Sequence, residues 1–136
     1  MLQQTKLYDL KAIDLDIEYT NHQQSIDYFL HHAINQVAHD HPDIICISCK
    51  AAQFPFSALF TRSYKQLYPD TQIIMGGWMP TLAPDTVLNM TPCDAIIRGE
   101  GERSLLELLP VIDDKQWKID GVSYYDKLRN QIVHNP

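Results

Sequence analysis

The sequence predicts an α/β fold built on a doubly wound parallel sheet. Short apolar runs alternate with longer segments in which apolar residues recur at helical spacing. Two of these runs end abruptly in glycine, at Gly76-Gly77 and within residues 98–102. Buried parallel strands have this pattern, with turns where the strands stop. Ligands bind at the carboxyl ends of strands in open α/β sheets, so two glycine-rich strand ends predict a broad ligand lying across that edge.

Strands and helices are expected to alternate over the first 109 residues. Four runs have the length of strands, at residues 10–17, 44–48, 72–75 and 94–97. Four segments with helical periodicity follow them, at residues 26–40, 55–67, 84–90 and 102–109. Thr20-Asn21 offers an N-cap to the first helix and Pro42 closes it, while Pro55 and Pro84 suit first helical turns. The run at 10–17 alternates only loosely, which favours a strand near the sheet edge.

The two ends of the chain differ from this pattern. Residues 122–125 and 131–134 flank a polar turn, which predicts a β-hairpin. We therefore expect an α/β domain at residues 1–118 and a hairpin extension at 119–136 that leads toward a further domain. Residues 1–8 are polar and short. Two readings stay open for them: the first strand of the sheet is missing, or these residues are a disordered lead-in.

Composition narrows the function classes. The 136 residues fit one domain, and the net charge of −6 argues against nucleic acid or an anionic membrane as partner. No apolar run is long enough to span a bilayer, and no signal peptide opens the chain. Cys46, Cys49 and Cys93 do not form a disulfide framework. A cytoplasmic location is therefore expected.

Several stretches together carry a family resemblance. They are residues 42–48 (PDIICIS), 76–81 (GGWMPT), 84–85 (PD), 94–102 (DAIIRGEGE), 105–109 and 119–124. From about Leu10 to Pro136 the sequence resembles the cobalamin-binding domain at the N-terminus of cobalamin-dependent radical S-adenosylmethionine enzymes. The glycine pair and the Arg-Gly-Glu-Gly-Glu motif are fairly specific at this spacing, whereas either alone is a weak signal.

The resemblance implies a flavodoxin-like, Rossmann-type sheet with cobalamin on its carboxyl edge and the corrin turned toward a separate radical domain. That catalytic domain carries a CxxxCxxC motif, which this sequence lacks. Cys46 and Cys49 are too few thiolates for an iron–sulfur cluster. The sequence thus resembles the binding half without the catalytic half, and we expect no catalysis by this chain alone.

Three strand-end loops supply the candidate cofactor-binding residues, with no catalytic or metal-ligating residue among them. Gly76 and Gly77 let a corrin or its nucleotide loop approach the backbone, although a plain tight turn also explains them. Ser48 either hydrogen-bonds the ligand or caps its strand. Trp78 packs on the corrin rim, covers the sheet or meets the missing domain. The full set is Ser48, Cys49, Lys50, Gly76, Gly77, Trp78, Met79, Pro80, Arg98, Gly99, Glu100 and Gly101.

The motif at 98–102 combines two glycines with a helix start. Its N–H groups are candidates to bind corrin amide oxygens or the nucleotide phosphate. Glu100 and Glu102 also suit the positive end of a helix without any ligand, and for Glu102 we favour that role. No partner nearby in sequence supports a glutamate as general acid or base.

The histidines bear on how cobalt would be ligated. The DxHxxG motif of proteins that supply a lower-ligand histidine is absent. We expect the six histidines to be solvated side chains, namely His22, His31, His32, His39, His41 and His134. Bound cobalamin is then predicted to be base-off with no protein histidine on cobalt. Cys46 is expected to act as a small hydrophobe in a buried strand rather than as a redox partner of Cys49.

The leading hypothesis is a cobalamin-binding module that presents its cofactor to a radical S-adenosylmethionine domain or protein. The alternative is a non-catalytic interaction domain that keeps the fold without the ligand. A receiver or flavin domain is a weaker third reading, because no acidic cluster or phosphate loop follows the first strand. A missing first strand would leave unpaired strand edges, which keeps a homo-oligomer open.

Overall fold

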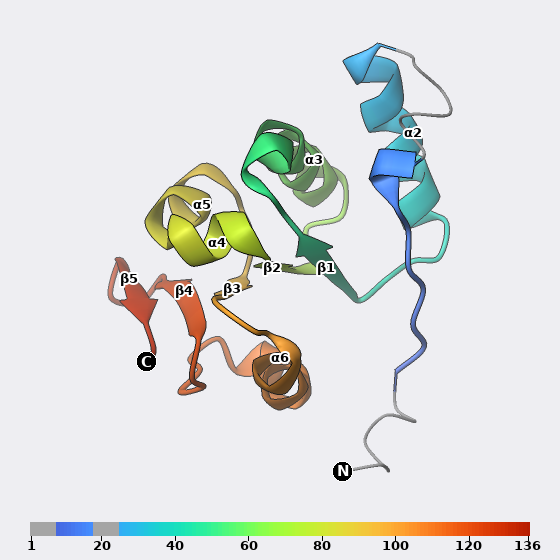
Figure 1. Cartoon of the computed structure of the whole chain (residues 1–136). Coiled ribbons are helices and arrows are strands. Elements are labelled where there is room, and N and C mark those ends of the chain that lie inside the picture. Colours follow the sequence, from blue (N-terminus) through green and yellow to red (C-terminus); the bar gives the residue numbers. More distant parts are fainter. Residues whose placement is uncertain (1–7, 18–24) are drawn as a thin grey trace. The chain divides into compact units, whose positions relative to one another are not determined.

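A computed structural model describes residues 8–17 and 25–136 (Figure 1). The chain divides into two compact units, residues 1–39 and residues 40–136. All strands of the described sheet and both glycine motifs lie in the second unit. In the described residues, no helix has the length and apolar character needed to cross a bilayer.

The first unit contains helix α2 (Ile26–Ala38), as the sequence predicts. Ser25 caps it by accepting the backbone N–H of Tyr28, while the expected cap at residues 20–21 lies outside the described residues. The strand predicted at residues 10–17 is wrong: residues 8–14 have no regular structure and 15–17 form a helical turn. The Asp14 carboxylate accepts the N–H groups of Asp16 and Ile17 at 3.1 and 3.2 Å. This local cap favours a helical turn over an extended strand.

The second unit is built on a five-stranded mixed sheet, which confirms the predicted α/β fold class. Strands β1 (Ile44–Ser48), β2 (Gln72–Gly76) and β3 (Ala95–Ile97) are parallel neighbours. The predicted hairpin forms as β4 (Val122–Asp126) and β5 (Gln131–His134). It joins the same sheet, because β4 pairs antiparallel with β3.

Helices cover both faces of this sheet. Helices α3 (Phe54–Leu67), α4 (Trp78–Leu82) and α5 (Pro84–Met90) lie on one face in Figure 1, and α6 (Glu102–Leu108) lies on the other. Short 3-10 segments occur at η2 (Ala51–Gln53) and η3 (Leu109–Asp114). Strand β2 is buried on both faces, since the exposed fractions of Ile73, Ile74 and Met75 are 0%, 2% and 0%. This double burial explains why the predicted central strands are continuous apolar runs.

Strand β1 is an edge strand of the described sheet, with β2 as its one hydrogen-bonded neighbour there. Cys46 is exposed, so the expectation that it would be a buried hydrophobe is wrong. Its register partner Ile74 faces the core cluster that includes Leu108 of α6. On that face, the core cluster therefore covers β2 at Ile74 but leaves Cys46, in the middle of β1, exposed.

The amino end of the parallel strands is held by the Asp94 carboxylate, whose side chain is 18% exposed. It accepts the Ile73 N–H at 2.8 Å and pairs with the Lys65 ammonium at 2.8 Å. The Asp94 N–H donates to the Ile73 carbonyl at 2.8 Å in return. One carboxylate thereby connects the start of β3 to β2 and to α3.

We predict that Asp94→Ala lowers the free energy of unfolding by about 2–4 kcal/mol, because a backbone N–H and a largely buried ammonium lose their partner. Urea unfolding followed by circular dichroism measures the change. The control is Asp70→Ala, which removes an exposed carboxylate that has no ion pair in the described residues. Equal stability of the two variants would contradict this role of Asp94.

Candidate functional site

The predicted loops do gather at the carboxyl edge of the parallel strands. Ser48 and Gly76, the last residues of β1 and β2, are register partners. The Arg98–Gly101 segment follows β3, which pairs with β2. The three loops therefore lie in sequence along one edge of the sheet.

The loops after β1 and β2 are joined through their backbones. The Cys49 N–H donates to the Gly76 carbonyl at 2.8 Å, and the Met79 N–H donates to the Cys49 carbonyl at 3.0 Å. Gly77 has a φ of 98°, and a Cβ on it would lie 2.9 Å from the Cys49 carbonyl oxygen. Gly77 is thus required by the approach of the chain's own backbone, whatever else binds there.

The five glycines of the chain fall into two groups by what a side chain would meet. A Cβ on Gly101 would lie 3.1 Å from Ile97 Cγ2, and a Cβ on Gly121 would lie 3.1 Å from the Arg98 carbonyl oxygen. At these two positions, as at Gly77, the protein's own atoms leave little room for a side chain. A Cβ on Gly76 would make only an ordinary contact at 3.7 Å, and one on Gly99 would meet nothing within 4 Å. Gly99 therefore leaves open space at the edge that an external group can occupy, and Gly76 has room for a Cβ.

Thr81 connects the two glycine motifs, and sequence reasoning did not select it as a site residue. Its hydroxyl donates to the Gly77 carbonyl at 2.8 Å and accepts the Gly99 N–H at 2.9 Å. One feature of the sequence could have indicated this role: Thr81 lies four residues after Gly77. In a helix, a threonine hydroxyl at this spacing often donates to the backbone carbonyl one turn back.

Arg98 is engaged by the end of the chain. Its backbone N–H donates to the Gly121 carbonyl at 2.8 Å, and its guanidinium donates to the carbonyl oxygens of Asn135 and Pro136. Its Nε is buried without a hydrogen-bond partner in the described residues. The structure thus gives Arg98 a role in fixing the two residues that follow β5, and its cofactor role stays a prediction.

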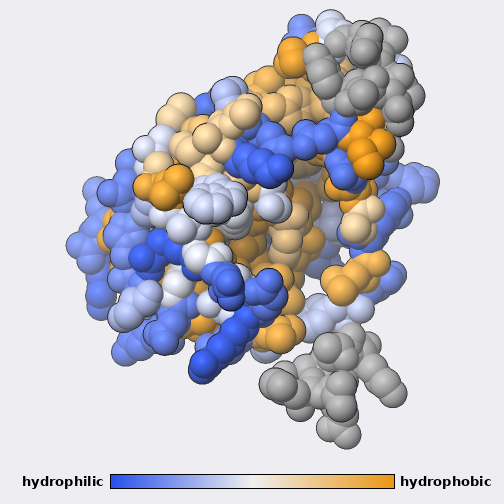
Figure 2. Space-filling model, in the orientation of Figure 1, coloured by the Kyte–Doolittle hydropathy of each residue, from blue (hydrophilic) through white to orange (hydrophobic). Residues whose placement is uncertain are grey.

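Trp78 and Leu82 place apolar surface beside the glycine loops. Their exposed fractions are 70% and 72%. They lie four residues apart on α4, so they share one face of that helix. Pro80 from the same predicted set is buried instead. Figure 2 shows that hydrophobic residues reach the surface at several separate places among hydrophilic ones.

The cysteine thiols are poor nucleophiles or ligands here. Burial raises the pKa of the Cys49 thiol, against a smaller opposing effect of a hydrogen bond with Ser57. Burial also raises the pKa of Cys93 to about 11. Both thiols are therefore neutral near pH 7. Among the described residues, no cluster of histidine, cysteine and acidic side chains is arranged to hold a metal ion.

A Ser-His-Asp chain lies between the hairpin and α5. His134 Nδ1 lies 2.8 Å from Ser123 Oγ, and His134 Nε2 lies 2.6 Å from Asp85 Oδ1. His134 is exposed, as expected of a solvated histidine, but both of its ring nitrogens also have protein partners. Ser123 has an exposed fraction of 0%, so no substrate reaches its hydroxyl. The arrangement therefore ties β4 and β5 to α5 and does not form a hydrolase site.

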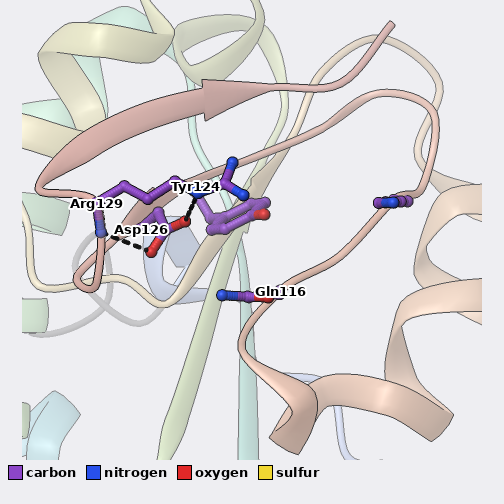
Figure 3. Close-up of a pocket in the computed structure, with 5 residues that line it drawn as sticks. Gln116, Tyr124, Asp126 and Arg129 are labelled. Atoms are coloured by element: carbon purple, nitrogen blue, oxygen red, sulfur yellow. Dashed lines mark hydrogen bonds and ion pairs between the residues drawn. The ribbon is translucent and has the colours of Figure 1, made fainter.

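Two polar hollows lie at the opposite end of the sheet from the glycine loops. One, of about 300 Å³, is lined by Gln116, Lys118, Tyr124, Asp126 and Arg129 (Figure 3). Arg129 is paired with Asp126 there, at 3.7 Å. The other, of about 340 Å³, is lined by Asp43, Ile44, Asp70, Gln72, Ile112 and Asp113. Ile44 and Gln72 begin their parallel strands, and Asp126 ends β4, which runs antiparallel to β3, so neither hollow belongs to the carboxyl edge.

Known proteins resemble this chain, one in sequence and others in structure. At 30% identity over 95 residues, the chain matches the uncharacterized methyltransferase PH0819 of Pyrococcus horikoshii, covering 66% of the chain and 21% of that protein. The structure resembles the cobalamin-dependent S-adenosylmethionine radical enzyme OxsB with aqua-cobalamin and S-adenosylmethionine bound, at 21% identity and a TM-score of 0.61. It resembles OxsB with aqua-cobalamin alone at 23% identity and a TM-score of 0.58.

The OxsB matches cover 82% of this chain but only 15% of that enzyme. The chain therefore spans about a fifth or less of the length of these relatives. The OxsB matches, at 21% and 23% identity, show a shared fold alone. Residues 8–109, which include all three loops of the carboxyl edge, match the family described as the B12 binding domain. The chain belongs to the B12-binding domain family.

Proposed function

We propose that the chain binds cobalamin across the carboxyl edge of its sheet and presents it to a radical S-adenosylmethionine domain or partner protein. The observation that carries the proposal is the open space at Gly99, beside strand-end loops that are bound to one another. Family membership and the fold shared with a cobalamin-bound enzyme support it.

The residues at this edge fit a large ligand with amide groups. Gly76 and Gly99 would let the corrin approach the backbone. Ser48 is exposed, and its hydroxyl has no hydrogen-bond partner in the described residues, so it is available to the ligand. The exposed Trp78 ring offers an apolar face to the corrin rim. Bound cobalamin would supply a cobalt centre that can carry a methyl group, while this chain holds and orients it.

Three residues of the predicted set have a structural role within this proposal, namely Arg98, Gly77 and Gly101. Their packing maintains the shape of the edge, as does that of the buried Cys49 and Pro80, and cofactor contact through Lys50, Met79 and Glu100 completes the proposed set. We propose no catalysis by this chain alone. Its three free cysteines suit the reducing cytoplasm that we propose as its location.

The position of the histidines supports a cobalt centre without a protein histidine ligand. Both ring nitrogens of His134 are engaged by Ser123 and Asp85. His41 precedes β1, at the amino end of the parallel strands and away from the glycine loops. These two histidines of the second unit are therefore not free at the proposed site to ligate cobalt.

We predict that Gly99→Asn weakens hydroxocobalamin binding at least about tenfold, or about 1.4 kcal/mol, while the domain stays folded. Asparagine tolerates the positive φ of 74° at this position and puts a side chain into space that the ligand needs. Gel filtration after mixing with hydroxocobalamin and absorbance titration measure binding, and circular dichroism measures folding.

The matched control is Leu128→Asn in the hairpin turn, where the wild-type side chain is 86% exposed at the other end of the sheet. Gly77→Val is a poor probe, because its side chain would collide with the Cys49 backbone and disturb the edge itself. If wild-type protein does not co-elute with hydroxocobalamin, the alternative of an interaction domain without ligand replaces the proposal.

Electron paramagnetic resonance of the reduced cob(II)alamin complex tests the mode of ligation. We predict a spectrum without superhyperfine splitting from an axial nitrogen. Splitting that persists in every His→Ala variant would assign the axial nitrogen to the cofactor's own base. Splitting lost in one variant would identify a protein histidine, and either result contradicts a base-off cofactor without a histidine ligand.

A further inference from the structure

We infer that Thr81 is a positioning residue, whose hydroxyl sets the spacing and orientation of the two glycine loops that receive the ligand. The inference rests on the proposed function and adds a residue that does not itself need to touch the cofactor. It starts from the hydroxyl's two bonds, to the Gly77 carbonyl at 2.8 Å and from the Gly99 N–H at 2.9 Å.

The direction of this hydrogen-bond chain is fixed by chemistry. A backbone N–H only donates, so Thr81 Oγ1 accepts from Gly99. The carbonyl of Gly77 only accepts, so the single hydroxyl proton points toward Gly77. Such a chain, from amide through hydroxyl to carbonyl, strengthens each of its bonds by polarisation.

The two glycines need an external constraint. Their φ values are 98° at Gly77 and 74° at Gly99. Glycine reaches such conformations at no steric cost but also leaves them easily, since it has the largest backbone freedom of any residue. Gly99 has no atom within 4 Å of the position of a Cβ, so side-chain packing does not hold it there. The Thr81 hydroxyl supplies the constraint.

Helix α4 extends this constraint to the third loop. The Thr81 N–H also donates to the Gly77 carbonyl, at 3.3 Å, so the side-chain bond is the shorter of the two. At the other end of α4, the Met79 N–H holds the Cys49 carbonyl after β1. One short helix therefore connects all three strand ends, and Thr81 is its connection to the Gly99 loop.

The test compares Thr81→Val, which keeps the shape but removes the hydroxyl, with Thr81→Ser, which restores it. Thr86→Val is the matched control, because Thr86 is an exposed threonine on α5. Amide hydrogen exchange at Gly99 is measured by nuclear magnetic resonance without cofactor. The dissociation constant for hydroxocobalamin is measured in parallel.

We expect Thr81→Val to speed exchange at Gly99 and to raise the dissociation constant, each by about tenfold, which corresponds to about 1.4 kcal/mol. Thr81→Ser should restore both quantities, and Thr86→Val should change neither. Unchanged exchange at Gly99, or faster exchange with an unchanged dissociation constant, would overturn the inference. Failure of wild-type protein to bind hydroxocobalamin would instead sink the proposed function, and exchange at Gly99 would then decide alone whether Thr81 holds the loop.

Discussion

The close approach of Gly77 to the backbone of Cys49 is the constraint on which the carboxyl edge depends. With a Cβ only 2.9 Å from the Cys49 carbonyl oxygen, any other residue would force the two loops apart. Because glycine allows the approach, the Cys49 and Met79 N–H groups find partners across the loops at 2.8 and 3.0 Å. Helix α4 then starts directly after β2 and brings Thr81 within reach of Gly99.

The opposite end of the sheet is held by charge. The Asp94 carboxylate joins β2, β3 and α3 there, and Met75 and Ile96, in the strands between the two ends, have exposed fractions of 0%. The sheet is thereby fixed at its amino end, and at the carboxyl edge the Thr81 hydroxyl holds the Gly99 backbone. Gly99 remains open to a ligand and Gly76 is uncrowded, while the internal glycines maintain the edge around them.

Local pattern predicted most of the fold, and it failed where a single side chain decides the outcome. Helical periodicity and continuous apolar runs located the strands and helices of the second unit within a residue or two at their ends, apart from the short α4. The predicted strand at 10–17 is absent because Asp14 caps a helical turn. The contacts of His134 with Ser123 and Asp85, and of Thr81 with Gly99, join residues far apart in sequence, which periodicity does not encode. The glycine motifs can be recognised in the sequence. Only the three-dimensional structure shows which of these glycines are crowded by the protein's own atoms and which are not.

The most direct test of the account is to map hydroxocobalamin onto the backbone by nuclear magnetic resonance. Amide signals of the protein are recorded with and without the cofactor. We predict that the perturbed amides cluster at residues 48–50, 76–81 and 98–101, along one edge of the sheet. Perturbations centred on the hollow around Tyr124 and Arg129, or no perturbation at saturating cofactor, would contradict the central claim that the glycine edge is the cobalamin site.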